Sequence, residues 1–254
     1  MSELKYFVSD FHFGAGLAGD NESLARFERF CSSLPCDAQL YILGDFFDFW
    51  IEHKYTVRLD FAEIYTVLVN TKRRGVEIFM VRGNHDFIRG NFFEKLGVEV
   101  FDDATKFEIG AKKVCCIHGD GISKDFFYNI MKFILKSACF QLFYKTIHPT
   151  VSIYLAQFAS NLSRKKNKKT VKSATRKERY RKYALEFLEK RGLDVLIMGH
   201  SHIFDLYKSD GRIYANCGAW FEKPTYVLLD RNKLFLKEFG SDIQSDAVLE
   251  EMEI

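Results

Sequence analysis

The chain has 254 residues, of which 47% are hydrophobic and 28% are charged, and its formal net charge is +3. This composition excludes an intrinsically disordered chain, and the length allows one large domain with an insertion. No apolar stretch approaches the roughly 18 residues that span a bilayer. A strand-like segment at 6–8 follows the first five residues directly, which leaves no room for a signal peptide.

The six cysteines have no regular spacing and form no C-x-x-C pair, which is typical of a reduced protein. We therefore expect a cytoplasmic protein that is soluble or bound peripherally to the inner membrane.

Positive charge is concentrated in one segment. Between Arg164 and Lys182 there are 11 Lys or Arg and one Glu, so this segment carries +10 and the rest of the chain −7.

Short apolar runs rich in Val, Ile, Phe and Tyr predict buried strands at 4–9, 40–43, 76–81, 114–117 and 195–198. Helical patterns lie between several of them, at 21–33 and 56–74. This order predicts an α/β fold, in which ligands collect at the carboxyl ends of the strands.

The pattern changes to a mainly helical, apolar stretch at 123–192, which predicts a helical cap inserted into a core of residues 1–122 and 193–241. Further strands are predicted at 203–207, 212–215, 225–229 and 234–239, as an antiparallel set that completes a second sheet. The acidic tail at 242–254 is expected to be frayed.

Each of the first five predicted strands ends in residue types that bind metals. The motifs are Asp10-x-His12, Gly44-Asp45, Gly83-Asn84-His85-Asp86, His118-Gly-Asp120 and Gly199-His200-x-His202. Carboxylate and amide oxygens mixed with imidazoles suit a pair of first-row divalent ions, which can hold a phosphoryl group and activate water. Each motif alone is more often a capped turn or a buried polar residue. Five of them at strand ends predict a two-metal phosphoesterase.

Two features of these motifs indicate how they would bind metal. Asp10 and His12 alternate along the chain, as do His200 and His202, so each pair is expected on one side of an extended segment. Asp45 has two oxygens and is the natural bridge between ions spaced ~3.5–4 Å apart. Asp48 either accepts a hydrogen bond from a ligating histidine or caps the following turn.

These residues resemble the calcineurin-like metallophosphoesterase family, whose pattern is Asp-x-His, Gly-Asp, Gly-Asn-His-Asp, His-Gly and Gly-His-x-His. The resemblance implies a two-sheet α/β sandwich with a cap. It implies that one ion is held by Asp10, His12, Asp45 and His202, and the other by Asp45, Asn84, His118 and His200. His85 matches the family histidine that protonates the leaving group or steadies the transition state, with Asp86 orienting it.

Within the family, the chain is most similar to members that hydrolyse a nucleotide-lipid in lipid A biosynthesis. The similarity rests on residues 41–50, on His-Gly-Asp-Gly at 118–121, on the insertion and on Gly-Ala-Trp at 218–220. It implies hydrolysis of the pyrophosphate of a diacylated UDP-sugar to UMP and the acylated sugar 1-phosphate, with two Mn2+ ions. The substrate-binding residues it implies are Asn84, Asp125, Ser163, Asn167 and Lys169.

Two departures from that subfamily concern the substrate. The best-known members carry Asn-Arg-Asp where this chain has Asn84-His85-Asp86. The lysine expected seven residues after Ser163 is Thr170, with Lys168 and Lys169 just before it.

The insertion combines aromatic helices with a basic run, as an acylated sugar nucleotide requires. Lys and Arg near an anionic leaflet contribute about 1 kcal/mol each, so the run could also dock the protein on the membrane. Aromatic positions at helical spacing are more often core, and a basic run is usually a solvated face.

Two other functions compete with this interpretation. A nuclease or cyclic-nucleotide phosphodiesterase would use the same metal pair, and the basic run could track a nucleic acid. The aromatic residues precede the basic run as a block and do not interleave with it as base-stacking residues would, so no nucleic acid is expected. A non-catalytic scaffold on the same fold is disfavoured because every ligand position is intact.

Overall fold

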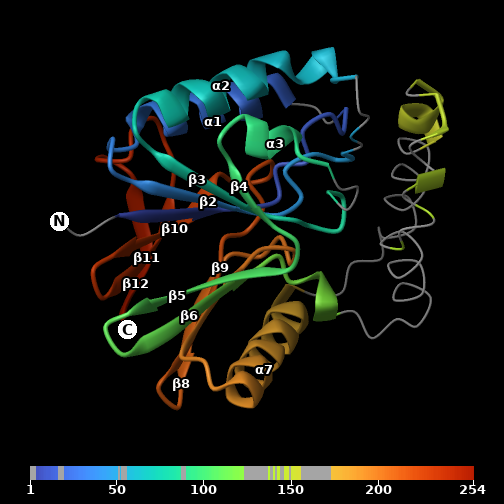
Figure 1. The fold of residues 1–254 in the computed structure, drawn as a ribbon. Coiled ribbons are helices and arrows are strands. Elements are labelled where there is room, and N and C mark those ends of the chain that lie inside the picture. The colour runs from blue at the N-terminus through green and yellow to red at the C-terminus, as the bar shows by residue number, and fades with distance from the viewer. Residues whose placement is uncertain are drawn as a thin grey trace.

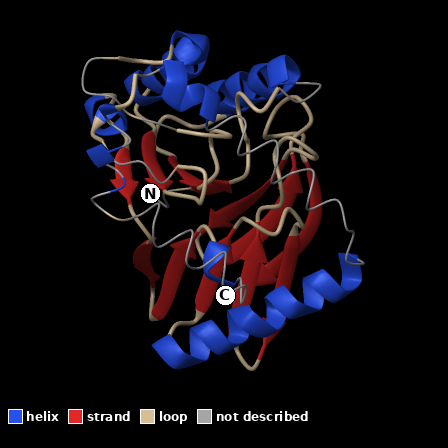
Figure 2. Ribbon diagram, turned by 90° about the vertical axis from the view of Figure 1, so that its right-hand side faces the viewer, coloured by secondary structure: helices blue, strands red, loops and turns tan. Residues whose placement is uncertain are grey.

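The structure is a computed structural model that describes residues 4–16, 20–50, 52, 56–86, 90–122, 137, 140, 142–143, 146–148, 150–155 and 173–254. Two sheets lie face to face, with helices α1 and α2 over the first and helix α7 over the second (Figures 1 and 2). The predicted two-sheet α/β architecture is confirmed.

The first sheet has the strand order β12-β11-β10-β1-β2-β3-β4. Its parallel half consists of β1 (Lys5–Val8), β2 (Gln39–Leu43), β3 (Glu77–Val81) and β4 (Glu99–Phe101). Its antiparallel half consists of β10 (Thr225–Asp230), β11 (Lys233–Glu238) and β12 (Ala247–Glu253). The connecting helices are α1 (Asp20–Ser33), η1 (Leu59–Phe61), α2 (Ala62–Arg73) and α3 (Phe92–Lys95).

The second sheet has the strand order β5-β6-β7-β9-β8. Its strands are β5 (Ala104–Ile109), β6 (Lys112–Ile117), β7 (Val195–Met198), β8 (Asp205–Ser209) and β9 (Arg212–Asn216), and β6, β7 and β9 are parallel. The short helix η2 (Asp120–Ile122) follows β6, and α7 (Ser173–Arg191) precedes β7.

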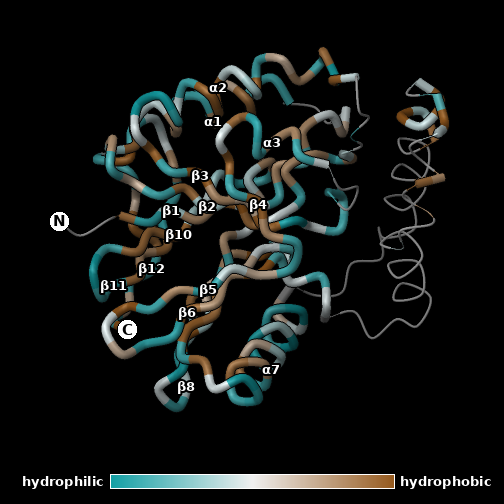
Figure 3. Tube along the Cα trace, in the orientation of Figure 1, coloured by the Kyte–Doolittle hydropathy of each residue, from teal (hydrophilic) through white to brown (hydrophobic). Residues whose placement is uncertain are grey.

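Side-chain alternation along β1 and β2 builds the two cores. Tyr6 and Leu40 face α1 and α2, whereas Phe7 and Tyr41 face the second sheet. The rings of Phe7 and Tyr41 stack at 4.9 Å between centroids. Hydrophobic residues accordingly concentrate along the strands (Figure 3). Burial on both faces explains why the parallel strands read as continuous apolar runs.

The predicted arrangement of the C-terminal strands is wrong. They do not form one antiparallel set, because β10 and β11 join the first sheet through β1, while β8 and β9 join the second. In addition, β9 pairs in parallel with β7. Local alternation identifies strands but does not choose their partners, which tertiary packing decides.

The C-terminal tail is also not frayed as expected. Its strand β12 pairs antiparallel with β11 at the edge of the first sheet. The turn before it is held by the buried carboxylate of Asp246, which accepts hydrogen bonds from Tyr226 Oη (2.8 Å) and the Gly240 N–H (2.9 Å). These pairings order the tail despite its acidic surface.

Helix α7 lies within the predicted insertion but packs on the second sheet. Tyr180, Ala184 and Leu188 are buried there beside Leu196. The division of the chain at residues 122 and 193 stays a prediction, since residues 123–136 and 156–172 lie outside the described residues.

Candidate metal centre

The loops after β1, β2 and β3 of the first sheet meet the loops after β6 and β7 of the second. Parallel strands end at the same edge of a sheet, so their loops converge. The meeting point gathers the predicted ligands Asp10, His12, Asp45, Asn84, His118, His200 and His202.

One group of donors consists of Asp10, His12 and His202. Asp10 Oδ1 lies 3.3 Å from His202 Nε2 and 3.9 Å from His12 Nε2. The backbone N–H of His200 donates to the other oxygen of Asp10 at 2.8 Å, which fixes the orientation of this carboxylate.

The second group consists of Asp45, His118 and His200. Asp45 Oδ2 lies 3.3 Å from His118 Nε2, and the His200 ring nitrogen Nδ1 lies 3.2 Å from the same nitrogen. Asn84 Oδ1 approaches His118 Nε2 at 3.2 Å, which adds an amide oxygen to this group.

Asp45 lies between the two groups. Its Oδ2 is 3.3 Å from His118 in the second group and 3.7 Å from His12 in the first. Its Oδ1 accepts the backbone N–H of His85 at 2.9 Å. One carboxylate oxygen within reach of both groups is the arrangement that a bridging ligand requires.

His12 provides a test of whether the donor set fits a cation. The residue is 7% exposed, and both of its ring nitrogens are buried without a hydrogen-bond partner among the described residues. A buried polar atom without a partner is costly unless something else satisfies it. A divalent ion bound by imidazole nitrogen and carboxylate oxygen would satisfy Nε2, so the residues fit the group.

The electrostatics of the site agree with this fit. Burial acts to raise the pKa of Asp45, but His118, through its charge and hydrogen bond, together with His85 and His12 outweighs burial and holds the pKa well below its usual range. Burial acts to lower the pKa of His118, but Asp45 raises it to about 10. Burial, reinforced by His118, lowers the pKa of His200 to about 4. The metal-free site therefore holds a protonated imidazole beside a neutral one.

The family model described as calcineurin-like phosphoesterase matches residues 6–204, which include every motif of the centre. The chain belongs to this family. As a calcineurin-like phosphoesterase it is a metal-dependent hydrolase, and its donor groups are the candidate positions for the divalent ions.

Curated relatives of this phosphoesterase align over most of its length. A UDP-2,3-diacylglucosamine hydrolase from Porphyromonas gingivalis is 25% identical and covers 91% of this chain and 96% of its own. Proteins of the same name from Haemophilus influenzae and Pectobacterium carotovorum are 27% and 28% identical, covering 88% and 92% of this chain and 93% and 98% of their own.

Solved structures align with the chain at low sequence identity. The phosphoesterase Yfce from E. coli is 16% identical, with a TM-score of 0.47, and the alignment covers 99% of both chains. Vacuolar Protein Sorting 29 from Cryptosporidium parvum is 15% identical, with a TM-score of 0.47 over 100% of this chain and 99% of that one.

Five residues of the phosphoesterase centre have left-handed backbones, a conformation rare outside glycine. They are Asp10, His12, Asp45, His200 and His202, with φ between 51° and 64°. The expectation that the Asp-x-His and His-x-His pairs alternate along extended chain is therefore wrong. The chain turns at five of the seven predicted ligands, and the surrounding packing maintains the strain that this costs.

Two glycines allow the loops to approach each other closely. A Cβ at Gly199 would lie 2.5 Å from Asp10 Oδ2, and a Cβ at Gly83 would overlap the Asp45 carboxylate. These two glycines are thus needed for space around the carboxylates.

His85 lies beside both donor groups and forms, with His12 and Asp45, a third group that could hold an ion; its side chain is 26% exposed. Its ring meets that of His12 edge-on at 4.9 Å between centroids, and its Nδ1 contacts the backbone carbonyl of Asp48. The Asp48 carboxylate lies 3.8 Å from His85 Nδ1 and 3.7 Å from His12 Nδ1. Asp48 therefore accompanies two site histidines and is not simply a turn cap.

The Asp86 carboxylate instead binds backbone. It accepts the N–H groups of Phe46, Phe47 and Gly83 at 3.2–3.4 Å and thereby ties the loop after β3 to the loop after β2. Its predicted role in orienting His85 stays a prediction.

The structure does not describe all of the predicted substrate-binding residues. Asp125, Ser163, Asn167 and Lys169 lie outside the described residues.

Two residues beside the centre were not predicted from the sequence. They are Glu222, whose Oε1 is 3.9 Å from His202 Nδ1, and Tyr180, whose ring centroid is 6.5 Å from that of His200. Neither residue belongs to a motif, and only the fold brings them here.

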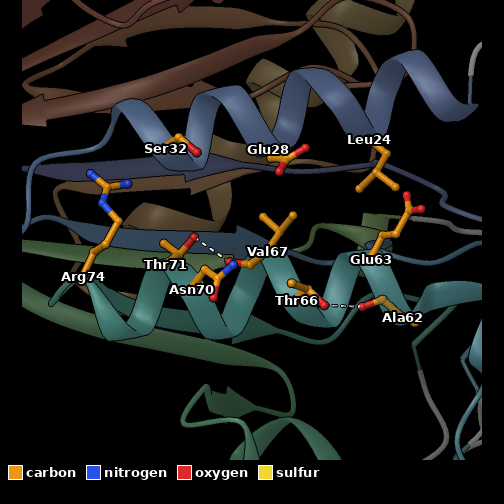
Figure 4. A pocket seen from close by; sticks show the side chains of 10 residues that line it. All are labelled: Leu24, Glu28, Ser32, Ala62, Glu63, Thr66, Val67, Asn70, Thr71 and Arg74. Atoms are coloured by element: carbon orange, nitrogen blue, oxygen red, sulfur yellow. Dashed lines mark hydrogen bonds between the residues drawn. The ribbon is translucent and has the colours of Figure 1, made fainter.

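A separate groove of about 460 Å3 lies between α1 and α2 (Figure 4). Its lining includes Glu28, Glu63 and Arg74 but none of the metal-site residues. Thr66 and Thr71 in its wall donate to carbonyls of their own helix, those of Ala62 and Val67. The groove is therefore distinct from the phosphoesterase centre.

Proposed function

We propose that this phosphoesterase hydrolyses the pyrophosphate of UDP-2,3-diacylglucosamine, releasing UMP and 2,3-diacylglucosamine 1-phosphate, with two Mn2+ ions as cofactors. The observation that carries the proposal is the complete donor set, with the groups Asp10–His12–His202 and Asp45–His118–His200 meeting at Asp45. The relatives named for this substrate support it, because they align over about nine-tenths of the chain.

The chain's own residues have distinct parts in this reaction. Two divalent ions at such a site bind phosphoryl oxygens, make water acidic and neutralise developing charge. His85, partly exposed beside both donor groups, would donate a proton to the departing oxygen or a hydrogen bond to the phosphoryl oxygens. Asp48, whose carbonyl contacts His85 Nδ1, would hold the ring in place.

The acyl chains would lie against the insertion. Its described part has exposed apolar side chains at Leu142, Phe143, Val151, Tyr154 and Leu155. None of the helices in the described ranges is both long and apolar enough to cross a bilayer. The proposed access to a lipid substrate is therefore peripheral docking on anionic membrane through the basic run, which high salt should abolish in liposome flotation.

The deciding experiment is Mn2+-dependent release of UMP from UDP-2,3-diacylglucosamine beside UDP-N-acetylglucosamine, which lacks the acyl chains. Preference for the acylated substrate by orders of magnitude is expected. Equal or absent activity on both would reject this substrate, and comparable turnover of single-stranded DNA would favour a nuclease.

A further inference from the structure

Helix α7 has a buried stripe with cations on both sides. The stripe is formed by Tyr180, Ala184 and Leu188. On one side, Arg181 binds the buried Asp205 carboxylate through Nε (2.8 Å) and Nη2 (2.9 Å), and Lys177 Nζ reaches it at 2.9 Å. These two cations anchor the helix to the second sheet, so their charges are already paired.

The buried stripe approaches the metal centre at Tyr180. Tyr180 places its ring 6.5 Å from that of His200, and the Arg179 guanidinium lies 5.8 Å from the Tyr180 ring centroid. Arg179 also lies within hydrogen-bonding reach of the Tyr180 hydroxyl. Arg179 is thus linked through one side chain to a residue of the second donor group.

Arg176 lies one turn before Tyr180 on the same helix. Its charge acts electrostatically on both Tyr180 and Glu222. Glu222 in turn lies 3.9 Å from Nδ1 of His202. Arg176 therefore acts on two residues that lie beside different donor groups.

Arg176 and Arg179 differ from the anchoring pair because both are exposed, and neither forms an ion pair with another described residue. Paired ions at Asp45 can accommodate one phosphoryl group. A pyrophosphate brings a second anionic phosphate, which needs cations next to the centre. A guanidinium supplies forked, charge-assisted hydrogen bonds for such oxygens, and the first turns of a helix favour anions.

We propose that Arg176 and Arg179 bind the second phosphate of a pyrophosphate substrate, the one that is not attacked at the metal centre. This inference rests on the proposed function for its substrate class. The site would select diphosphates over monophosphates and would set which phosphorus reaches the ions. The plain alternative is that both arginines are solvated surface charges that contribute nothing to binding.

The test uses the full-length Mn2+-loaded protein and the variants Arg176→Ala, Arg179→Ala and their double. Lys182→Ala is the matched control, since it removes the same charge from an exposed position of the same helix. Binding of UDP and of UMP is measured by calorimetry in excess Mn2+, together with KM and kcat for UDP-2,3-diacylglucosamine. Metal content and melting temperature are recorded for each variant.

The wild type is expected to bind UDP more tightly than UMP. The double variant should weaken UDP binding and raise KM by about 10–100-fold, with a much smaller effect on UMP. Lys182→Ala should match the wild type. Equal losses for UDP and UMP, a double variant that behaves like Lys182→Ala, or a wild type that binds neither nucleotide would overturn the inference.

The same measurements separate this inference from the proposed function. If the wild type prefers UDP through the two arginines but leaves the nucleotide-lipid intact, the phosphate site stands and the substrate is wrong. If the nucleotide-lipid is hydrolysed equally well by the double variant, the substrate stands and the phosphate site is wrong.

Discussion

Metal loading is predicted to expel a proton from His118. In the metal-free protein Asp45 raises the pKa of His118 to about 10, so the ring is protonated at pH 8. A ligating histidine must be neutral, and each pKa unit corresponds to about 1.4 kcal/mol, so at pH 8 deprotonation costs about 3 kcal/mol. This cost falls as pH rises toward 10, so the apparent affinity for the ions should rise tenfold per pH unit for each proton displaced.

The pKa values of the other ligand histidines determine how many protons metal binding should release. The pKa of His202 is also raised to about 10, through Asp10, but its side chain is 32% exposed, so solvent screening makes its share smaller. His200, whose pKa is lowered to about 4, is already neutral at pH 8 and contributes none. Between one and two protons should therefore be released by these residues.

The assay is titration calorimetry of Mn2+ into metal-free protein at pH 8, in two buffers with different ionisation enthalpies. The difference between the observed heats gives the number of protons released. His118→Gln is the control, because it removes one displaceable proton and keeps the remaining donors. Binding heats that are the same in both buffers would refute the reasoning that His118 is held protonated by Asp45.

The other predictions concern single residues of the centre. His85→Ala should lower kcat by about 100-fold or more with metal content unchanged; metal analysis that shows loss of an ion would make His85 a ligand. Asp45→Ala should lose metal and activity together, because Asp45 belongs to two of the three groups that could hold an ion, and an active variant would contradict the proposed bridging role. Gly199→Ala should lower metal affinity, since its Cβ would lie 2.5 Å from Asp10 Oδ2; unchanged Mn2+ binding would show that the loop can shift without cost.

Much of the parallel part of the fold follows from the sequence. The apolar runs at 40–43 and 195–198 correspond to β2 and β7 within one residue, because a strand buried on both faces has no polar positions. Strand β4 was missed because it has three residues and is half-exposed. The tail strand β12 was missed because its exposed face is acidic, and only pairing with β11 orders it.

The candidate site, like the fold, could be predicted from the sequence only in part. Ligand identities can be read from the sequence because the donor residues recur at strand ends, in three of the five motifs directly after a glycine. The left-handed backbones of these residues cannot be read from the sequence, because neither Asp nor His indicates a positive φ by itself. Glu222 approaches His202 from the loop after β9, and Arg176 acts on Glu222 from a helix remote in sequence, so no local pattern indicates them.

Each donor group draws on both sheets, and this explains how the strained loops persist. The first combines Asp10 and His12 after β1 with His202 after β7; the second combines Asp45 after β2 with residues after β6 and β7. Five left-handed residues and the like charges of the buried carboxylates Asp10 and Asp45 oppose this arrangement. The apolar interface between the sheets, where Phe7 is fully buried and stacks on Tyr41, must therefore hold the loops together before any ion binds. A site preorganised in this way need not order its ligands at the moment of binding.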